Sequence, residues 1–169
     1  MDSYPDHLIR SILDQTHTIA MIGASKNWVR PSNFAMKYLQ QKGYKVIPVN
    51  PAYAGININN ETCYSDLSEV PGPVDMVDIF RRSEEAGAVV DQAITVKDNV
   101  GVKTVWMQLG VTDEAARVRA EDAGLNVIMN RCPKIEYGRL NHELSWSGIN
   151  SGVISSKRPR LARLHRHRD

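Results

Sequence analysis

The chain has 169 residues, of which 42% are hydrophobic and 24% are charged, as expected for one soluble globular domain. No apolar run approaches the roughly 20 residues that span a bilayer, and the polar N-terminus does not have the form of a secretory signal. Two cysteines are too few for a disulfide framework, so we expect a cytoplasmic protein with reduced thiols.

The net charge of +2 is unevenly distributed along the chain. Residues 156–169 carry six Lys or Arg and one acid, which leaves fifteen bases against eighteen acids, a charge of −3, on the remainder. We interpret residues 1–150 as one domain and residues 151–169 as a flexible basic tail. Such a tail could attract nucleic acid or an anionic membrane surface, and a nucleic-acid-binding or partner-binding protein acting through it is one functional alternative.

Apolar strand patterns alternate with helical patterns along the chain. In chain order we predict a helix at 5–15, a strand at 17–22, a helix at 32–41 with Phe34, Tyr38 and Leu39 facing inward, a strand at 44–49, a loop at 52–73 with a helical turn at 66–69, a strand at 74–80, a helix at 83–95, a strand at 103–109, a helix at 112–123 and a strand at 125–130. This alternation predicts the α/β class: a Rossmann-like, doubly wound, mainly parallel five-stranded sheet with helices on both faces.

A glycine turn, Gly23-Ala24-Ser25, follows the first predicted strand. Ligands of doubly wound sheets bind beyond the carboxyl ends of the strands, and a glycine there lets the backbone approach the ligand closely. The next helix would present its N-terminus to a phosphate, and Arg30 and Ser32 could add a charge and a hydroxyl. Because this is not a full G-x-G-x-x-G motif, the alternative is that Gly23 only ends a strand and Ser32 only caps a helix.

Asn50 stands where a dinucleotide site would have Asp or Glu to bind the ribose hydroxyls. A neutral side chain tolerates a ribose phosphate that a carboxylate would repel. Coenzyme A carries both a 3′-phosphate and a pyrophosphate, so it is the favoured cofactor, with NAD or NADP as the alternative.

Five segments, IGASKNWVRPS, VIPVNP, VDMVDIFRRSEE, KTVWMQLGV and NRCPKIEYGRL, resemble in this order the stand-alone CoA-binding domain proteins. Those proteins are similar to the CoA-binding domain of the succinyl-CoA synthetase alpha subunit, and the resemblance covers roughly residues 12–144. It implies a binding protein for CoA or acyl-CoA without assigned catalysis, in a metabolic or a CoA-linked redox or regulatory role. The resemblance implies that the phosphates contact Gly23, Ala24 and Ser25, that Arg30, Pro31 and Ser32 complete the loop, that Asn50 and Pro51 border the adenosine, and that Phe80, Arg81 and Gln108 line the next edges.

Cys132 follows the last predicted strand, beside Arg131 and a helix start at Pro133. Both neighbours could lower the pKa of the thiol, which makes Cys132 a candidate redox site that forms a mixed disulfide with CoA. A small oxidoreductase or acyl-transfer enzyme using Cys132 is therefore the other functional alternative, and a small residue packed at a turn is the structural one. Asp75 and Asp78 do not form an obvious general acid–base pair, and we assign no metal site.

Overall fold

The computed structural model describes residues 3–142, and its helices and strands lie between Asp6 and Leu140. The predicted basic tail at 151–169 lies outside the described residues. The helices are α1 (Asp6–Gln15), α2 (Pro31–Gln41), α3 (Ser83–Val100), α4 (Glu114–Asp122) and α5 (Pro133–Leu140), with short 3-10 turns η1 (Pro51–Tyr53) and η2 (Leu67–Glu69). The strands are β1 (Thr18–Ile22), β2 (Lys45–Val49), β3 (Asn57–Ile58), β4 (Glu61–Thr62), β5 (Met76–Ile79), β6 (Thr104–Met107) and β7 (Asn126–Ile128). Among these residues, no helix has the length and apolarity needed to cross a membrane.

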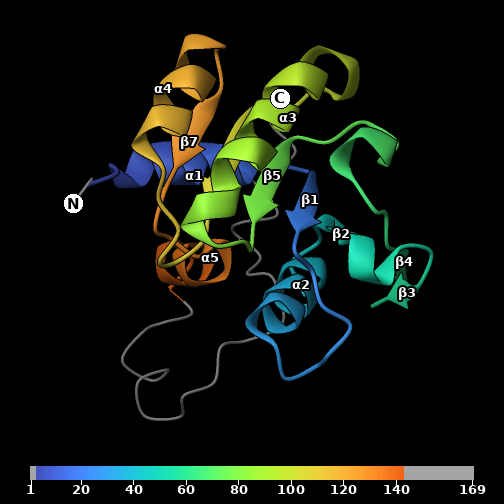
Figure 1. Ribbon diagram of the computed structural model, residues 1–169. Helices are drawn as coiled ribbons and strands as arrows, with labels where there is room; N and C mark the ends of the chain where they lie inside the picture. The colour runs from blue at the N-terminus through green and yellow to red at the C-terminus, as the bar shows by residue number, and fades with distance from the viewer. Residues whose placement is uncertain (1–2, 143–169) are drawn as a thin grey trace.

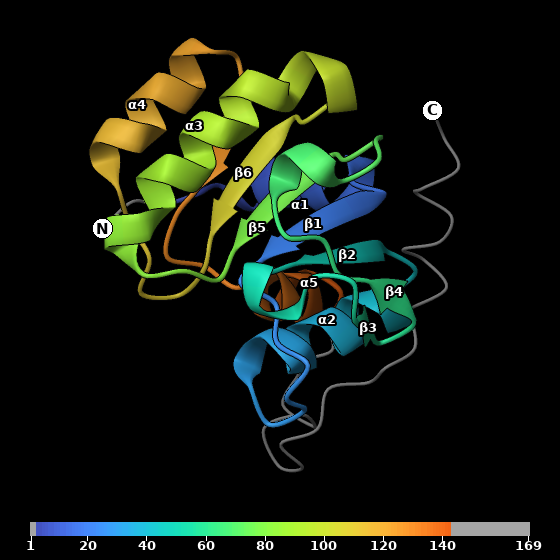
Figure 2. The same cartoon turned by 45° about the vertical axis from the view of Figure 1, so that its right-hand side comes forward.

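Five strands form one parallel sheet in the order β2-β1-β5-β6-β7. Helices α3 and α4 pack on one face, whereas α1, α2 and α5 pack on the other (Figure 2). The predicted Rossmann-like α/β class, with helices on both faces of a five-stranded parallel sheet, is confirmed. Because all five strands run in the same direction, their carboxyl ends meet at one edge, beside the β1–α2 loop (Figure 1).

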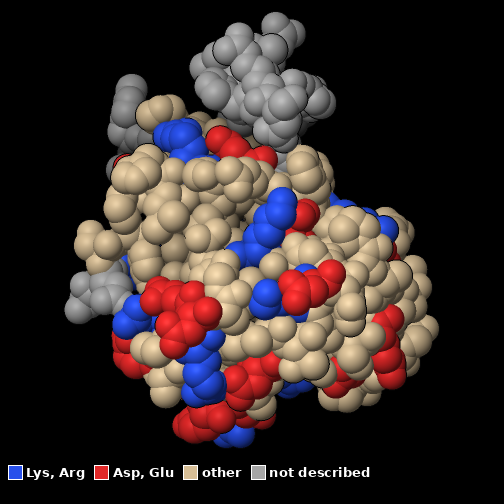
Figure 3. Space-filling view, turned by 90° about the horizontal axis from the view of Figure 1, so that it is seen from above, with Lys and Arg blue, Asp and Glu red and all other residues tan. Residues whose placement is uncertain are grey.

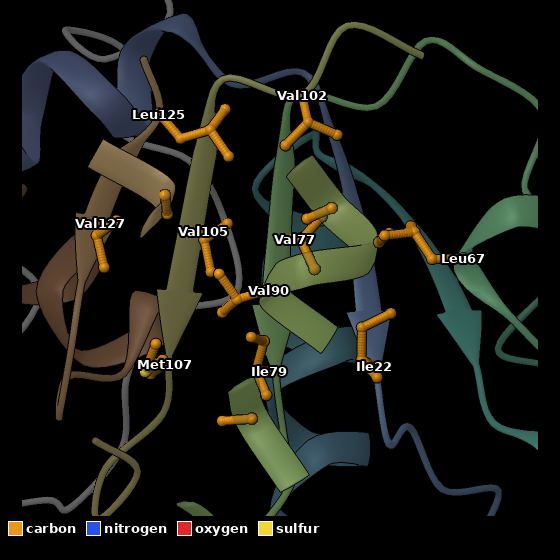
Figure 4. Packing of buried hydrophobic residues seen from close by; sticks show 14 of the residues in the cluster. Ile22, Leu67, Val77, Ile79, Val90, Val102, Val105, Met107, Leu125 and Val127 are labelled. Atoms are coloured by element: carbon orange, nitrogen blue, oxygen red, sulfur yellow. The ribbon is translucent and has the colours of Figure 1, made fainter. Parts of the chain in front are cut away.

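Alternation along each strand divides the core between the two faces of the sheet. On β5, Val77 and Ile79 pack under Val90 of α3, with β6 contributing Val105 and Met107 beside them (Figure 4). The alternate residues of β5 point to the other face. There Met76 joins the second apolar cluster.

Three details differ from the sequence prediction. Phe34 does not face inward but is 49% exposed, because the buried face of α2 is occupied by its neighbours along the helix. Helix α3 continues to Val100 instead of ending at residue 95, and it stops where Gly101 adopts a left-handed conformation with φ +86°. The predicted loop contains a small hairpin, β3–β4, whose turn residues Asn59 and Asn60 both have positive φ.

Candidate functional site

The turn after β1 lies directly against the end of β5. Gly23 has φ +87°, and a Cβ atom at this position would overlap the carbonyl oxygen of Phe80. Both the backbone conformation and the space therefore require glycine. The close approach brings the loops after two neighbouring strands together at the carboxyl edge of the sheet.

Hydrogen bonds from three polar side chains fix the loop that follows this turn. The hydroxyl of Ser32 accepts from the backbone N–H of Ser25 at 3.1 Å, and the Asn33 amide donates to the Ser25 carbonyl at 2.8 Å. From β2, the Asn50 amide donates to the Ala24 carbonyl at 2.9 Å. Ser32 and Asn50 thus shape the loop before any ligand is present.

A cavity of about 400 Å³ opens at this loop. Its walls come from the ends of β1, β2 and β5 and from the start of α2, where Arg30 precedes a helix that has no side-chain N-cap. The lining residues are Gly23, Ser25, Arg30, Pro31, Ser32, Asn50, Tyr53, Phe80 and Arg81. None of them is acidic, so this edge favours an anion.

Eight of the residues expected at the site line this one cavity, and three lie elsewhere. Ala24 is buried behind the loop, Pro51 is exposed beyond it, and Gln108 lines a neighbouring pocket. Tyr53, which η1 places in the cavity wall, was not expected, because the sequence predicts only loop there. The adjacent Arg82 pairs with Glu85 at 3.5 Å and does not line the cavity.

A second pocket, of about 620 Å³, adjoins this anion-binding cavity and shares Pro31, Phe80 and Arg81 with it. We call it the apolar pocket. It is lined by Val29, Pro31, Phe34, Ala35, Phe80, Arg81, Gln108, Leu109, Val111, Cys132, Lys134 and Ile135. Four of its aliphatic or aromatic side chains are among the most exposed hydrophobic groups of the described chain, so the pocket presents an apolar surface to solvent.

Gln108 and Cys132 line the apolar pocket, and Asp78 lies behind Gln108 without lining it. Asp78 is fully buried on β5, and the Gln108 amide donates to its carboxyl at 3.3 Å. Burial raises the pKa of the Asp78 carboxyl to about 8, and only the Gln108 hydrogen bond opposes that shift. Sequence analysis missed this role of Asp78, although an acid within an apolar strand of a two-sided sheet was the available signal.

The expected lowering of the Cys132 pKa is wrong. Burial raises the pKa of this thiol, and the backbone N–H groups at the start of α5 lower it by less. The Asp78 carboxylate raises the Cys132 pKa further. Arg131 does not compensate, because its guanidinium donates to the Asn130 carbonyl at 2.7 Å and lies over the Tyr4 ring.

Comparisons with known proteins agree with this arrangement. A family model described as a CoA binding domain matches residues 17–138. The uncharacterized protein YneT of Bacillus subtilis (strain 168) is 33% identical over 130 residues, which are 76% of this chain and 91% of that protein.

Two solved structures extend the comparison. A hypothetical protein from Pyrococcus horikoshii OT3 superposes with a TM-score of 0.75 at 36% identity, over 83% of this chain and 94% of that one. The dinucleotide-forming acetyl-coenzyme A synthetase 1 of Ca. Korarchaeum cryptofilum, in its apo form, gives a TM-score of 0.52 at 26% identity, over 65% of this chain and 25% of the synthetase chain. With the family model spanning every strand of the five-stranded sheet, this chain belongs to the CoA-binding domain family.

Proposed function

We propose that the protein binds coenzyme A or an acyl-CoA at the carboxyl edge of its sheet, with the pyrophosphate at the Gly23 turn. The observation that carries this proposal is the anion-binding cavity. There the N-terminus of α2, Arg30 and Arg81 lie around the Gly23 turn, whose backbone conformation and close contact with Phe80 require glycine. Membership of the CoA-binding domain family supports the same ligand.

Asn50 favours CoA over NAD for a structural reason. Its amide already donates to the Ala24 carbonyl, and its side-chain oxygen accepts from the Ala52 N–H at 3.0 Å. It therefore lacks the free carboxylate with which a dinucleotide site binds ribose hydroxyls, and it would not repel a ribose phosphate. Beside it, Pro51 is exposed and would border the adenosine.

Electrostatics also favour a polyanionic ligand at this end of the molecule. The opposite end, seen in Figure 3, carries Lys and Arg intermixed with Asp and Glu. In the anion-binding cavity the charged lining residues are cationic. CoA phosphates would bind there with charge-assisted hydrogen bonds.

We propose a role in binding and not in turnover. Cys132 is the thiol that lines the apolar pocket, and burial raises its pKa. A protonated thiol is a poor nucleophile. A mixed disulfide would form only by exchange with CoA disulfide, in which the Cys132 thiolate attacks one sulfur and the second CoA leaves as a thiol, and this exchange would be faster at higher pH.

Calorimetric titration of the full chain with CoA, dephospho-CoA, NAD and NADP tests the proposal. We expect CoA to bind most tightly, and Arg30→Ala and Arg81→Ala each to weaken it by roughly tenfold, which corresponds to about 1.4 kcal/mol. Arg117→Ala is the matched control, because Arg117 pairs with Glu114 and Glu121 on α4 outside both cavities. Absence of heat with CoA at high micromolar concentration, or tighter binding of NAD, would overturn the proposal.

A further inference from the structure

We infer that the apolar pocket holds the uncharged acyl group of an acyl-CoA, and that Gln108 at its inner side donates a hydrogen bond to the thioester carbonyl. This inference rests on the proposed function, because the CoA phosphates must occupy the adjoining anion-binding cavity. It names the class of acyl-CoA that the protein prefers: thioesters whose acyl group carries no carboxylate.

Continuity between the two cavities determines which ligand reaches the apolar pocket. Pro31, Phe80 and Arg81 line both of them, so a ligand anchored by its phosphates at Gly23 extends directly from one into the other. The part of CoA that leads away from the pyrophosphate ends in the thiol or thioester. The acyl group of such a ligand would therefore lie in the apolar pocket.

The walls of the pocket suit an aliphatic group. Among its lining residues, Val29 on the loop after β1 is 52% exposed, Leu109 on the loop after β6 is 56% exposed, and Val111 is buried. Removing these surfaces from water favours binding of an apolar group, by roughly three- to fourfold in affinity for each methylene that becomes buried.

Gln108 supplies the polar contact that a thioester needs. Its side-chain amide has two N–H donors; one is directed to the Asp78 carboxyl, and the same amide also interacts with the Cys132 thiol. Sulfur is a weak acceptor, so a thioester carbonyl that enters the pocket would replace it as the better partner. Asp78 does not line the pocket and acts on the ligand only by positioning Gln108.

The same three polar side chains disfavour a carboxylate on the acyl group. They are a carboxyl, an amide and a thiol, none of which is a cation. The two cations that line the pocket have other contacts: Arg81 also borders the anion-binding cavity, and Lys134 lies over the rings of Phe34 and Tyr38, at 5.9 and 5.6 Å from their centroids. A buried carboxylate would lose its hydration without gaining an ion pair.

Calorimetry with CoA, butyryl-CoA and succinyl-CoA on the full chain tests the inference. We expect butyryl-CoA to bind about tenfold more tightly than CoA, and succinyl-CoA no more tightly than CoA. Equal affinity for the two acyl-CoAs, with CoA still bound, would overturn the inference and leave the proposed function intact. If none of the three ligands bound, both the inference and the proposed function would be overturned.

Two variants locate the effect in the pocket. Gln108→Leu should weaken the binding of butyryl-CoA about three- to tenfold, whereas the affinity for CoA should change little. Leu109→Asp should abolish the preference for butyryl-CoA by placing a carboxylate at the mouth. The matched control is Val118→Asp, because Val118 is a similarly exposed aliphatic residue, 48% exposed, on α4. A wild-type preference in Leu109→Asp, or its loss in Val118→Asp, would contradict the assignment of this pocket.

Discussion

Replacement of Asp78 by Asn should stabilise the fold at neutral and alkaline pH. Asp78 has no exposed surface, and the Gln108 amide donates to its two carboxyl oxygens at 3.3 and 3.5 Å. Asparagine has nearly the same shape and keeps an oxygen that accepts the Gln108 hydrogen bond. The substitution therefore removes an ionisable group without removing its packing.

The magnitude follows from the two pKa values of Asp78. Its ordinary pKa is 3.8, whereas burial raises it to about 8 in the folded protein. Between these values the folded state holds one proton more than the unfolded state, so the free energy of unfolding falls as pH rises, and the decline ends above the folded pKa. At about 1.36 kcal/mol per pH unit, this amounts to roughly 4 kcal/mol by pH 7 and between about 5 and 6 kcal/mol above pH 8.

Urea unfolding between pH 5 and pH 8, followed by tryptophan fluorescence, measures this difference. Asp78→Asn should be more stable than the wild type at pH 8 by about 2 to 5 kcal/mol, and the two should converge toward pH 4. Asp75→Asn is the control, because the Asp75 carboxylate accepts the backbone N–H groups of His17 and Thr18, each at 2.9 Å, and its loss should lower stability by about 1 kcal/mol. An Asp78→Asn variant with the wild-type pH slope would refute the reasoning.

Three further predictions concern the turn, a helix cap and the thiol. Gly23→Ala should lower the free energy of unfolding by about 2 kcal/mol or more and weaken CoA binding, because its Cβ would meet the Phe80 carbonyl at a positive φ; wild-type values in urea unfolding and calorimetry would contradict this. Asp113→Ala should cost about 1 kcal/mol in urea unfolding, because the Asp113 side chain accepts the Ala116 N–H at 2.9 Å as the N-cap of α4, and Asp113→Asn should restore most of it. Cys132 should react with CoA disulfide slowly at pH 7 and faster above pH 9, since burial raises its pKa; a rate by mass spectrometry that does not change with pH would disagree.

The fold was predictable because its determinants are local. The short apolar runs that become β1 and β2, and the glycine that follows β1, can be read directly from the chain, and right-handed crossovers then limit the possible sheet orders. The end of α3 was less predictable. Its last five residues have a helical pattern only in the context of the core against which Val100 packs.

The site was predictable in outline but not in its chemistry. The sequence pointed to Asn50 because a dinucleotide site has Asp or Glu at this position. The hydrogen bond from its amide to the Ala24 carbonyl could not be predicted, because it depends on how two loops meet. Sequence reasoning could not foresee the raised pKa of Cys132, because the shift comes from burial, and the fold also brings Asp78 and Gln108, which are distant in sequence, near the thiol. Phe34 appeared to be a core residue for the same reason, since periodicity does not distinguish a buried face from the wall of a pocket.

The buried carboxyl of Asp78 links stability to the site. A side chain that lowers the free energy of unfolding by several kcal/mol at neutral pH, where an amide of the same shape would not, is expected at a functional position and not at a structural one. Its place behind Gln108 is consistent with that expectation, because the carboxyl fixes the donor that we assign to the thioester. The Asp78→Asn variant, whose oxygen still accepts the Gln108 hydrogen bond, should therefore gain stability and keep most of the preference for butyryl-CoA over CoA, whereas Asp78→Leu, which leaves Gln108 without this acceptor, should lose part of that preference. An Asp78→Leu variant with an unchanged acyl preference would separate Asp78 from the site and leave Gln108 to act alone.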